Sequence, residues 1–213
     1  MSARRIRLTD RILGEIGKAI NVLCSEARAR RPAPAAPGGE LDLDAPERLE
    51  SIRLMRVNHA GEIAAQALYQ GQALTARDCA AGAALRRAAA EEMDHLAWCE
   101  QRIKELNGRT SVLNPIWYAG SFCIGSLAGA LGDRASLGFL TETERQVESH
   151  LRSHLDRLPA ADQRSRAIVL QMTHDEMQHG ATAASLGGEK LPLWLKGAMH
   201  LTSRLMTRGS YWL

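Results

Sequence analysis

Apolar residues recur along most of this chain at the three-to-four-residue spacing of α-helices. No segment shows a convincing two-residue alternation, so strands are not expected. Turn signals such as Asn107-Gly108 and Gly187-Gly188 divide the pattern into separate helices. The pattern predicts an all-α fold around a four-helix bundle. The four long helices that we expect cover residues 46–76, 79–106, 133–158 and 161–186.

The N-terminal region adds an amphipathic helix, which we expect within residues 1–31. Its apolar face includes Ile12, Ile16 and Ile20. Eight Lys and Arg residues against three acidic ones give this stretch a local charge of +5. A stretch rich in Pro, Ala and Gly, residues 32–45, then predicts a linker to a main domain that spans residues 46–213.

Composition narrows the class of protein. A net charge of +3 does not indicate a nucleic-acid binder, and 4% aromatic residues favour helices over strands. The four cysteines form no CxxC pair, so neither a disulfide framework nor a thiolate zinc site is expected. No apolar run is followed by a small-residue cleavage site at the N-terminus, which predicts a cytoplasmic protein without a secretory signal.

A four-residue motif, ExxH, occurs twice, as Glu92-Met93-Asp94-His95 and as Glu176-Met177-Gln178-His179. Residues three apart on a helix differ by about 300° in direction and by about 4.5 Å along the axis. The Glu and the His of each motif therefore project from one face and can bind the same ion. A single ExxH is a weak signal, because both residue types are common on exposed helices.

Each motif is preceded by a glutamate on the helix before it. Glu62 lies 30 residues before Glu92, and Glu144 lies 32 residues before Glu176. Near-constant spacing of this kind predicts two duplicated helical hairpins. One Glu from each of two helices, with an ExxH from each of the other two, is the ligand set of di-iron and di-manganese bundles. The six candidate metal ligands are Glu62, Glu92, His95, Glu144, Glu176 and His179.

The charge of this set favours a metal over an empty core. Four buried carboxylates would repel one another and would carry a large desolvation cost. Two divalent cations balance the four negative charges while both histidines stay neutral. Mixed oxygen and nitrogen donors suit iron or manganese, whereas structural zinc prefers sulfur and histidine.

Three further side chains are candidates for supporting roles. Asp175, beside a ligand, could orient a histidine across the bundle. Glu148 lies one turn beyond Glu144 and could be a seventh ligand, a supporting side chain or an ordinary exposed acid. His59 is three residues before Glu62, and we interpret it as packing or support. The remaining histidines are expected at the surface: His150, His154, His174 and His200.

Four segments together resemble the demethoxyubiquinone hydroxylase family of ubiquinone biosynthesis. They are Met55-Arg56-Val57-Asn58-His59-Ala60-Gly61-Glu62, Glu91-Glu92-Met93-Asp94-His95, Thr143-Glu144 and Asp175-Glu176-Met177-Gln178-His179. The resemblance runs from about residue 46 to the C-terminus, and RVNHAGE is its most distinctive part. It implies a ferritin-like bundle in which Glu62 and His95 bind one iron and Glu144 and His179 the other. Glu92 and Glu176 would bridge the two ions.

The resemblance also implies an activity. Members of the family are peripheral membrane monooxygenases that use O2 to hydroxylate the ring of a polyprenylated methoxy-benzoquinol. The implied partners are an isoprenoid quinone and membrane lipid at the cytoplasmic face of the bacterial cell membrane, with no nucleic acid. A homo-oligomer or a partner in a biosynthetic complex stays open. No Rossmann or flavin fingerprint occurs, so an external quinol or NADH would be the reductant.

The sequence departs from the family at one point. Some members carry a tyrosine, next to a histidine, seven residues after the glutamate that matches Glu144. Here His150 is followed by Leu151, so no tyrosine is available at this position for an electron or proton step.

Residues 110–132 contain no charged side chain, and the C-terminal helix expected at residues 192–208 is apolar too. The uncharged segment could span a membrane, cover the bundle core, or rest on a bilayer and admit an isoprenoid tail. The last interpretation suits a substrate taken from a membrane best, and the basic N-terminal helix would add attraction for anionic lipid.

Other functions stay open on these residues. A ferritin-like hydroxylase acting on another substrate such as tRNA would explain the basic balance, but it gives residues 110–132 no role. A non-catalytic iron-binding or storage bundle would need a cage-forming surface. A metal-free helical scaffold would leave the glutamates unexplained.

Overall fold

The computed structural model describes residues 8–36 and 42–213, and the regular structure within them is entirely helical. The all-α prediction is therefore confirmed. The helices in chain order are α1 (Leu8–Cys24), α2 (Ala45–Thr75), α3 (Cys79–Glu105), α4 (Asn114–Ala130), α5 (Asp133–Arg157), α6 (Gln163–Ser185) and α7 (Leu193–Trp212).

Capping and turn residues lie at the helix ends, as the sequence predicts. Asp44 starts α2 through a capping box, in which its carboxylate accepts a hydrogen bond from the backbone of Glu47. The Glu47 side chain accepts one from the Asp44 backbone in return. Asn107, with a φ of 61°, follows the end of α3, and Gly132, with a φ of 111°, precedes α5. These residues separate the long helices within a few positions of where we expect them.

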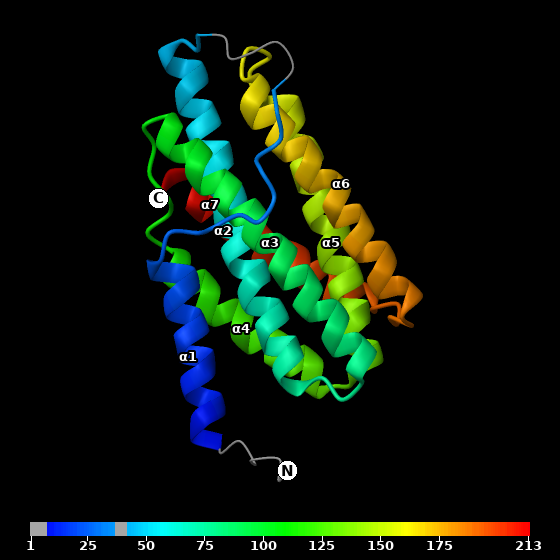
Figure 1. The fold of residues 1–213 in the computed structure, drawn as a ribbon. Helices are drawn as coiled ribbons and strands as arrows, with labels where there is room; N and C mark the ends of the chain where they lie inside the picture. Colours follow the sequence, from blue (N-terminus) through cyan, green and yellow to red (C-terminus); the bar gives the residue numbers. More distant parts are fainter. Residues whose placement is uncertain (1–7, 37–41) are drawn as a thin grey trace.

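Helices α2, α3, α5 and α6 lie side by side along most of their length (Figure 1). The closest pairs among them are α2 with α3 and α5 with α6. Each pair is a hairpin of consecutive helices, and α4 lies between the two hairpins in the chain. Met55, Trp98, Leu151 and Met172 come from the four helices in turn and pack into one hydrophobic cluster. The four helices thus share a single interior.

Helix α4, from the uncharged segment, packs against α2 with almost no space between the backbones. A Cβ atom on Gly125 would lie 2.1 Å from the carbonyl oxygen of Leu68, and one on Gly129 would lie 2.8 Å from the carbonyl oxygen of Gln72. Only glycine permits this approach. Across residues 8–36 and 42–213, no helix combines the length and the apolar character that crossing a bilayer requires.

The N-terminal helix is shorter than expected. It ends at Cys24, and residues 25–36, which we call the N-terminal strap, run without helical structure along the outside of α3 (Figure 1). Side chains of α3 accept the backbone N–H groups that a continued helix would bond internally. Ala27 donates to Glu100 at 3.1 Å, and Arg30 donates to Asp94 at 2.6 Å. Part of the expected linker, residues 37–41, lies outside the described residues.

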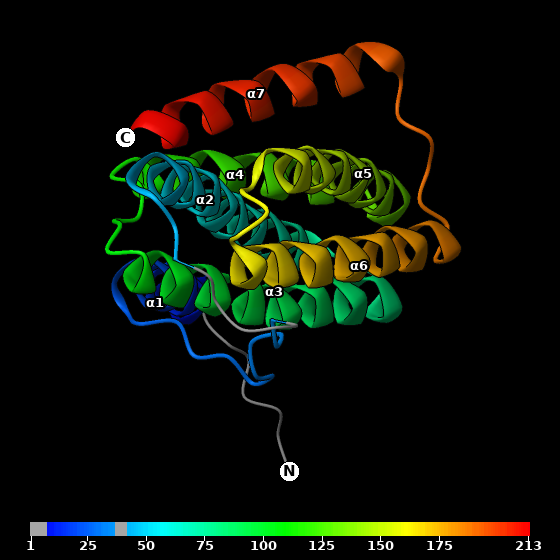
Figure 2. The same cartoon turned by 90° about the horizontal axis from the view of Figure 1, so that it is seen from above.

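Helix α7 lies on the far side of the bundle from the N-terminal strap (Figure 2). It packs mainly on α2, with a smaller contact on α5, and it continues to Trp212 rather than ending at residue 208. Its outer face leaves several large apolar side chains exposed, including Leu193, Trp194 and Leu201.

Candidate metal centre

The structure brings the six predicted ligands together in two overlapping groups. One group contains Glu62, Glu92, His95 and Glu176, and the other contains Glu92, Glu144, Glu176 and His179. Within each group, one donor atom per residue lies within 4.8 Å of every other. All six side chains are buried, and Glu92 and Glu176 are common to both groups. The cluster therefore has two adjacent positions that could each hold an ion.

Each ExxH motif orients its two side chains as helical geometry requires. The Nδ1 atom of His95 lies 3.0 Å from Glu92 on α3, and Nδ1 of His179 lies 3.3 Å from Glu176 on α6. Glu62 on α2 and Glu144 on α5 face these motifs from the neighbouring helices. Every ligand-bearing helix thus directs its donor atoms toward the same interior point.

The surroundings of His95 Nδ1 suit a cation better than a proton. This atom lies 3.0 Å from an oxygen of Glu92, 3.3 Å from Glu176 and 3.7 Å from Glu62. One N–H can donate well to only one of these carboxylates. A metal ion accepts a lone pair from the imidazole and from all three carboxylates at once, so the residues fit a metal.

Burial and neighbouring charges shift the pKa values of the cluster side chains in opposite directions. Burial and the neighbouring carboxylate of Glu92 raise the pKa of Glu62, and burial and Glu176 raise the pKa of Glu144. Burial acts to lower the pKa of His179, but hydrogen bonds to Glu176 and Glu92 raise it to about 12. The same competition raises the pKa of His95.

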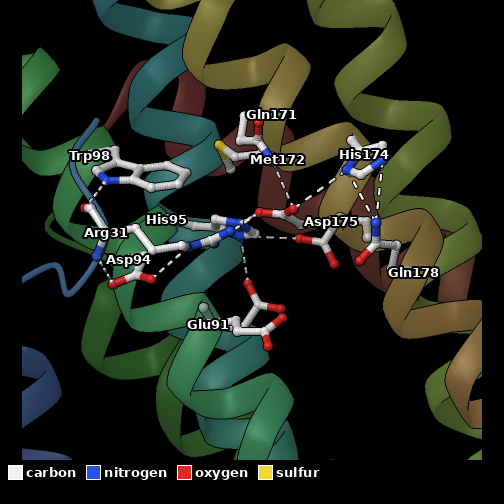
Figure 3. A network of polar contacts seen from close by, with 12 residues as sticks. Arg31, Glu91, Asp94, His95, Trp98, Gln171, Met172, His174, Asp175 and Gln178 are labelled. Atoms are coloured by element: carbon white, nitrogen blue, oxygen red, sulfur yellow. Dashed lines mark hydrogen bonds and ion pairs between the residues drawn. The ribbon is translucent and has the colours of Figure 1, made fainter. Parts of the chain in front are cut away.

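The outer nitrogen of each histidine is held by an acid from the opposite ExxH helix. His95 Nε2 lies 2.9 Å from Asp175 on α6 (Figure 3). His179 Nε2 lies 2.7 Å from Glu91 on α3. Each acid directly precedes the glutamate of its own motif, so the two contacts form a crossed pair. Such contacts fix the ring orientation and leave Nδ1 free to face a metal.

Of these two acids, sequence reasoning named Asp175 and missed Glu91. Glu91 precedes Glu92 just as Asp175 precedes Glu176, so the repeat itself contained the signal. Hydrogen bonds from His95, Arg31 and Gln171 lower the pKa of Asp175, although its burial acts in the opposite direction.

Tyr69 is a second residue that sequence reasoning missed. It is buried on α2, and its hydroxyl donates a hydrogen bond to Glu144. Tyr69 follows Glu62 by seven residues, which is two helical turns, so both side chains point from one face of α2. Leu151, at the position where some family members carry a tyrosine, packs instead in the hydrophobic cluster.

None of the three candidate supporting residues belongs to either ligand group, and unlike Asp175 the other two make hydrogen bonds with residues outside these groups. Glu148 accepts a hydrogen bond from Arg152 at 2.9 Å, and His59 is buried with its Nδ1 atom 3.5 Å from the amide nitrogen of Asn114.

The expectation that His154 lies at the surface is wrong. Its side chain is buried, and its Nδ1 atom lies 2.7 Å from the amide oxygen of Asn58. Burial lowers its pKa, so the ring is neutral. A polar partner on α2 allows this histidine to be buried, and spacing along α5 alone could not reveal that partner.

The fold and the cluster together define a class: an all-α protein with a buried carboxylate and histidine cluster consistent with a dimetal site. The chain belongs to the family described as Ubiquinone biosynthesis protein COQ7, whose profile matches residues 50–210. The resemblance found in the sequence is thereby confirmed.

Curated relatives match nearly the whole chain. A 3-demethoxyubiquinol 3-hydroxylase of Chromobacterium violaceum is 54% identical over 204 residues, which are 96% of this chain and 99% of the relative. The 3-demethoxyubiquinol 3-hydroxylase of Bordetella pertussis is 53% identical over 211 residues, 99% of this chain and 95% of the relative. The matches extend beyond the helices that carry the candidate ligands into the N-terminal region.

Proposed function

We propose that this chain is a 3-demethoxyubiquinol 3-hydroxylase of ubiquinone biosynthesis whose active site is a di-iron centre in a ferritin-like four-helix bundle. The observation that carries the proposal is the pair of overlapping ligand groups that share Glu92 and Glu176. Family membership and relatives above 50% identity over nearly the whole chain support the substrate.

Glu62 and His95 would hold one iron, Glu144 and His179 would hold the other, and Glu92 and Glu176 would contribute to both positions. Four carboxylates balance two divalent ions, so the loaded site carries no net charge inside the protein. Iron supplies the redox chemistry that lets O2 react with the quinol ring. One oxygen atom enters the ring, and the other leaves as water after two electrons and two protons arrive from an external reductant, a quinol or NADH.

The chain's own residues hold the ligands and exclude bulk water. The four glutamates and His95 are almost completely buried, with 0 to 3% of their surface exposed. Tyr69 orients Glu144, Asp175 orients His95, and Glu91 orients His179. These contacts preorganise the donor atoms, which limits the reorganisation that metal binding requires.

The chain acts as a peripheral protein at the cytoplasmic face of the membrane, where it meets its isoprenoid substrate. Helices α1, α4 and α7 each leave three or more large apolar side chains exposed. Such groups indicate a contact surface, whereas single exposed apolar residues are ordinary. The exposed set comprises Leu13, Ile16 and Ile20 on α1; Ile116, Ile124 and Leu127 on α4; and Leu193, Trp194, Leu201, Leu205 and Trp212 on α7. The basic charge of the N-terminal region adds attraction for anionic lipid.

The direct test is an assay of the purified protein with demethoxyubiquinol, O2 and a reductant, alongside metal analysis. Glu176→Ala should lose both bound iron and hydroxylation, because it removes a carboxylate shared by both metal positions. Glu189→Gln, which changes an exposed acid that pairs with Arg134 and belongs to neither ligand group, is the control and should retain both. Full turnover by Glu176→Ala would refute the ligand assignment. Bound iron without hydroxylation in the unaltered protein would favour an iron-storage role.

A further inference from the structure

The N-terminal strap makes its tightest contact with the bundle at Arg31. The backbone N–H of Arg30 donates to Asp94 at 2.6 Å, and the indole N–H of Trp98 donates to the carbonyl of Arg31 at 3.1 Å. These bonds fix the backbone on both sides of the Arg31 side chain. The strap is therefore attached to α3 at the level of the metal-binding cluster (Figure 3).

The guanidinium of Arg31 joins α3 to α6. Its Nε atom donates to Asp94 at 2.8 Å, and one terminal nitrogen donates to Asp175 at 2.8 Å. The same group lies over the ring of Trp98, 4.9 Å from its centroid. Asp94 and Asp175 are buried, so without this cation two uncompensated carboxylates would face each other.

The oxygen of Asp175 that accepts from Arg31 is also the one that contacts His95. Oδ2 lies 2.8 Å from Arg31 and 2.9 Å from His95 Nε2, while Oδ1 accepts from Gln171 at 2.8 Å. The carboxylate thus has three hydrogen-bond partners that determine its orientation, and His174 Nδ1 lies 3.7 Å from Oδ1. A chain of contacts leads from the strap through Asp175 to the ring of a predicted metal ligand.

The second histidine has no equivalent support. Glu91, which contacts His179, keeps 39% of its side chain exposed and makes no ion pair with an Arg or Lys within residues 8–36 and 42–213. The crossed acid contacts repeat in both halves of the bundle, whereas among the described side chains the arginine contact occurs only on the His95 side. The two metal positions therefore differ in how firmly their histidine is held.

We propose that Arg31 is a positioning residue, which orients Asp175 and through it His95, so that the N-terminal strap supports one of the two metal positions. The inference rests on the ligand assignment of the proposed function. Without Arg31, repulsion between Asp94 and Asp175 rotates the Asp175 carboxylate away from His95. The metal position of Glu62 and His95 is then weakened, and that of Glu144 and His179 is not.

Titration of the metal-free full chain with Co²⁺, followed by absorption spectroscopy and calorimetry, tests this. The unaltered protein should bind two ions. Arg31→Gln should bind one ion with unchanged affinity and the other about 10- to 100-fold more weakly, as for other losses of a partner to a metal-bound histidine. Arg31→Lys should restore part of the loss, because its ammonium can pair with only one carboxylate well.

Arg30→Gln is the matched control, since it removes the same charge from the adjacent residue and leaves the backbone bond to Asp94 in place. It should bind both ions normally. Asp175→Asn, which keeps the size of the side chain, should reproduce the selective loss, and combining it with Arg31→Gln should add little further.

The outcomes are separable. Two ions bound by Arg31→Gln with unchanged affinities would overturn the inference while leaving the proposed function intact. An equal loss at both positions, together with a lower unfolding temperature of the metal-free protein, would also overturn it and indicate a purely structural role. Fewer than two ions bound by the unaltered protein would overturn the ligand assignment itself.

Discussion

At the scale of single residues, the sequence allowed the six ligands to be proposed because their geometry is local. The offset within each ExxH is set by the helix, and the two upstream glutamates repeat with it. Tyr69 and Arg31 could not be found in this way. Tyr69 on α2 contacts Glu144 on α5, and Arg31 in the N-terminal strap contacts Asp175 on α6. Only tertiary packing determines which of these faces meet.

The bond from Tyr69 to Glu144 provides one prediction at this scale. Tyr69→Phe should lower the affinity for one of two metal ions about tenfold, because a hydrogen bond to a charged group contributes about 1.5 kcal/mol. Tyr118→Phe is the control, since its hydroxyl contacts Gln70 on the outside of α2 and neither metal-binding group. Competition with a coloured chelator measures both affinities, and an equal effect of the two substitutions would contradict the assignment.

Competition between protons and metal ions at the cluster provides a second prediction at this scale. Glu62, Glu144, His95 and His179 have raised pKa values without metal, and binding requires deprotonated carboxylates and neutral imidazoles. Metal binding therefore releases protons, so affinity should fall as the pH is lowered from 8 to 6. Calorimetric titrations with Mn²⁺ in two buffers of different ionisation enthalpy measure the release. Identical heats in both buffers would show that no protons leave.

At the scale of elements, the long helices could be located from periodicity and turn signals, because Asp44, Asn107 and Gly132 act through their own backbones. The end of α1 could not be located in this way. Its sequence continues with helix-compatible alanines and arginines, but Asp94 and Glu100 on α3 capture the backbone N–H groups beyond Cys24. A competing tertiary contact, invisible in the local pattern, terminates the helix.

The close contact between α4 and α2 can be tested with two glycines of one helix. Gly125→Ala should destabilise the protein by about 1–3 kcal/mol or more, because the added methyl group overlaps the carbonyl of Leu68. Gly120→Ala, with open space around it, should stabilise by about 0.5–1 kcal/mol through helix propensity. Urea denaturation measures both, and equal effects would show that α4 does not pack as described.

At the scale of the whole molecule, the apolar character of residues 110–132 and of the C-terminal helix was evident, but its distribution over faces was not. Part of α4 is used against α2, while Ile116, Ile124 and Leu127 stay exposed. Hydropathy along the chain cannot separate side chains that pack on another helix from those that face outward.

The proposed membrane association can be tested at the exposed apolar side chains of α7. The double substitution Leu201→Glu and Leu205→Glu on α7 should reduce binding to vesicles that contain anionic lipid at least tenfold, since burial of each leucine contributes about 1.5 kcal/mol or more. Ala160→Glu, at an exposed site between α5 and α6, is the charge control. Co-sedimentation measures the bound fraction, and unchanged binding of the double variant would exclude α7 from the membrane contact.

The crossed acid contacts also determine when the site can come into existence. His95 meets Asp175 across 80 residues of sequence, and His179 meets Glu91 across 88. Neither hairpin can complete a metal position alone, so a chain still emerging from the ribosome has no assembled site until α6 is available. In zinc fingers, metal binding drives folding. Here we expect iron capture to follow the docking of the two hairpins, as one of the last steps in maturation.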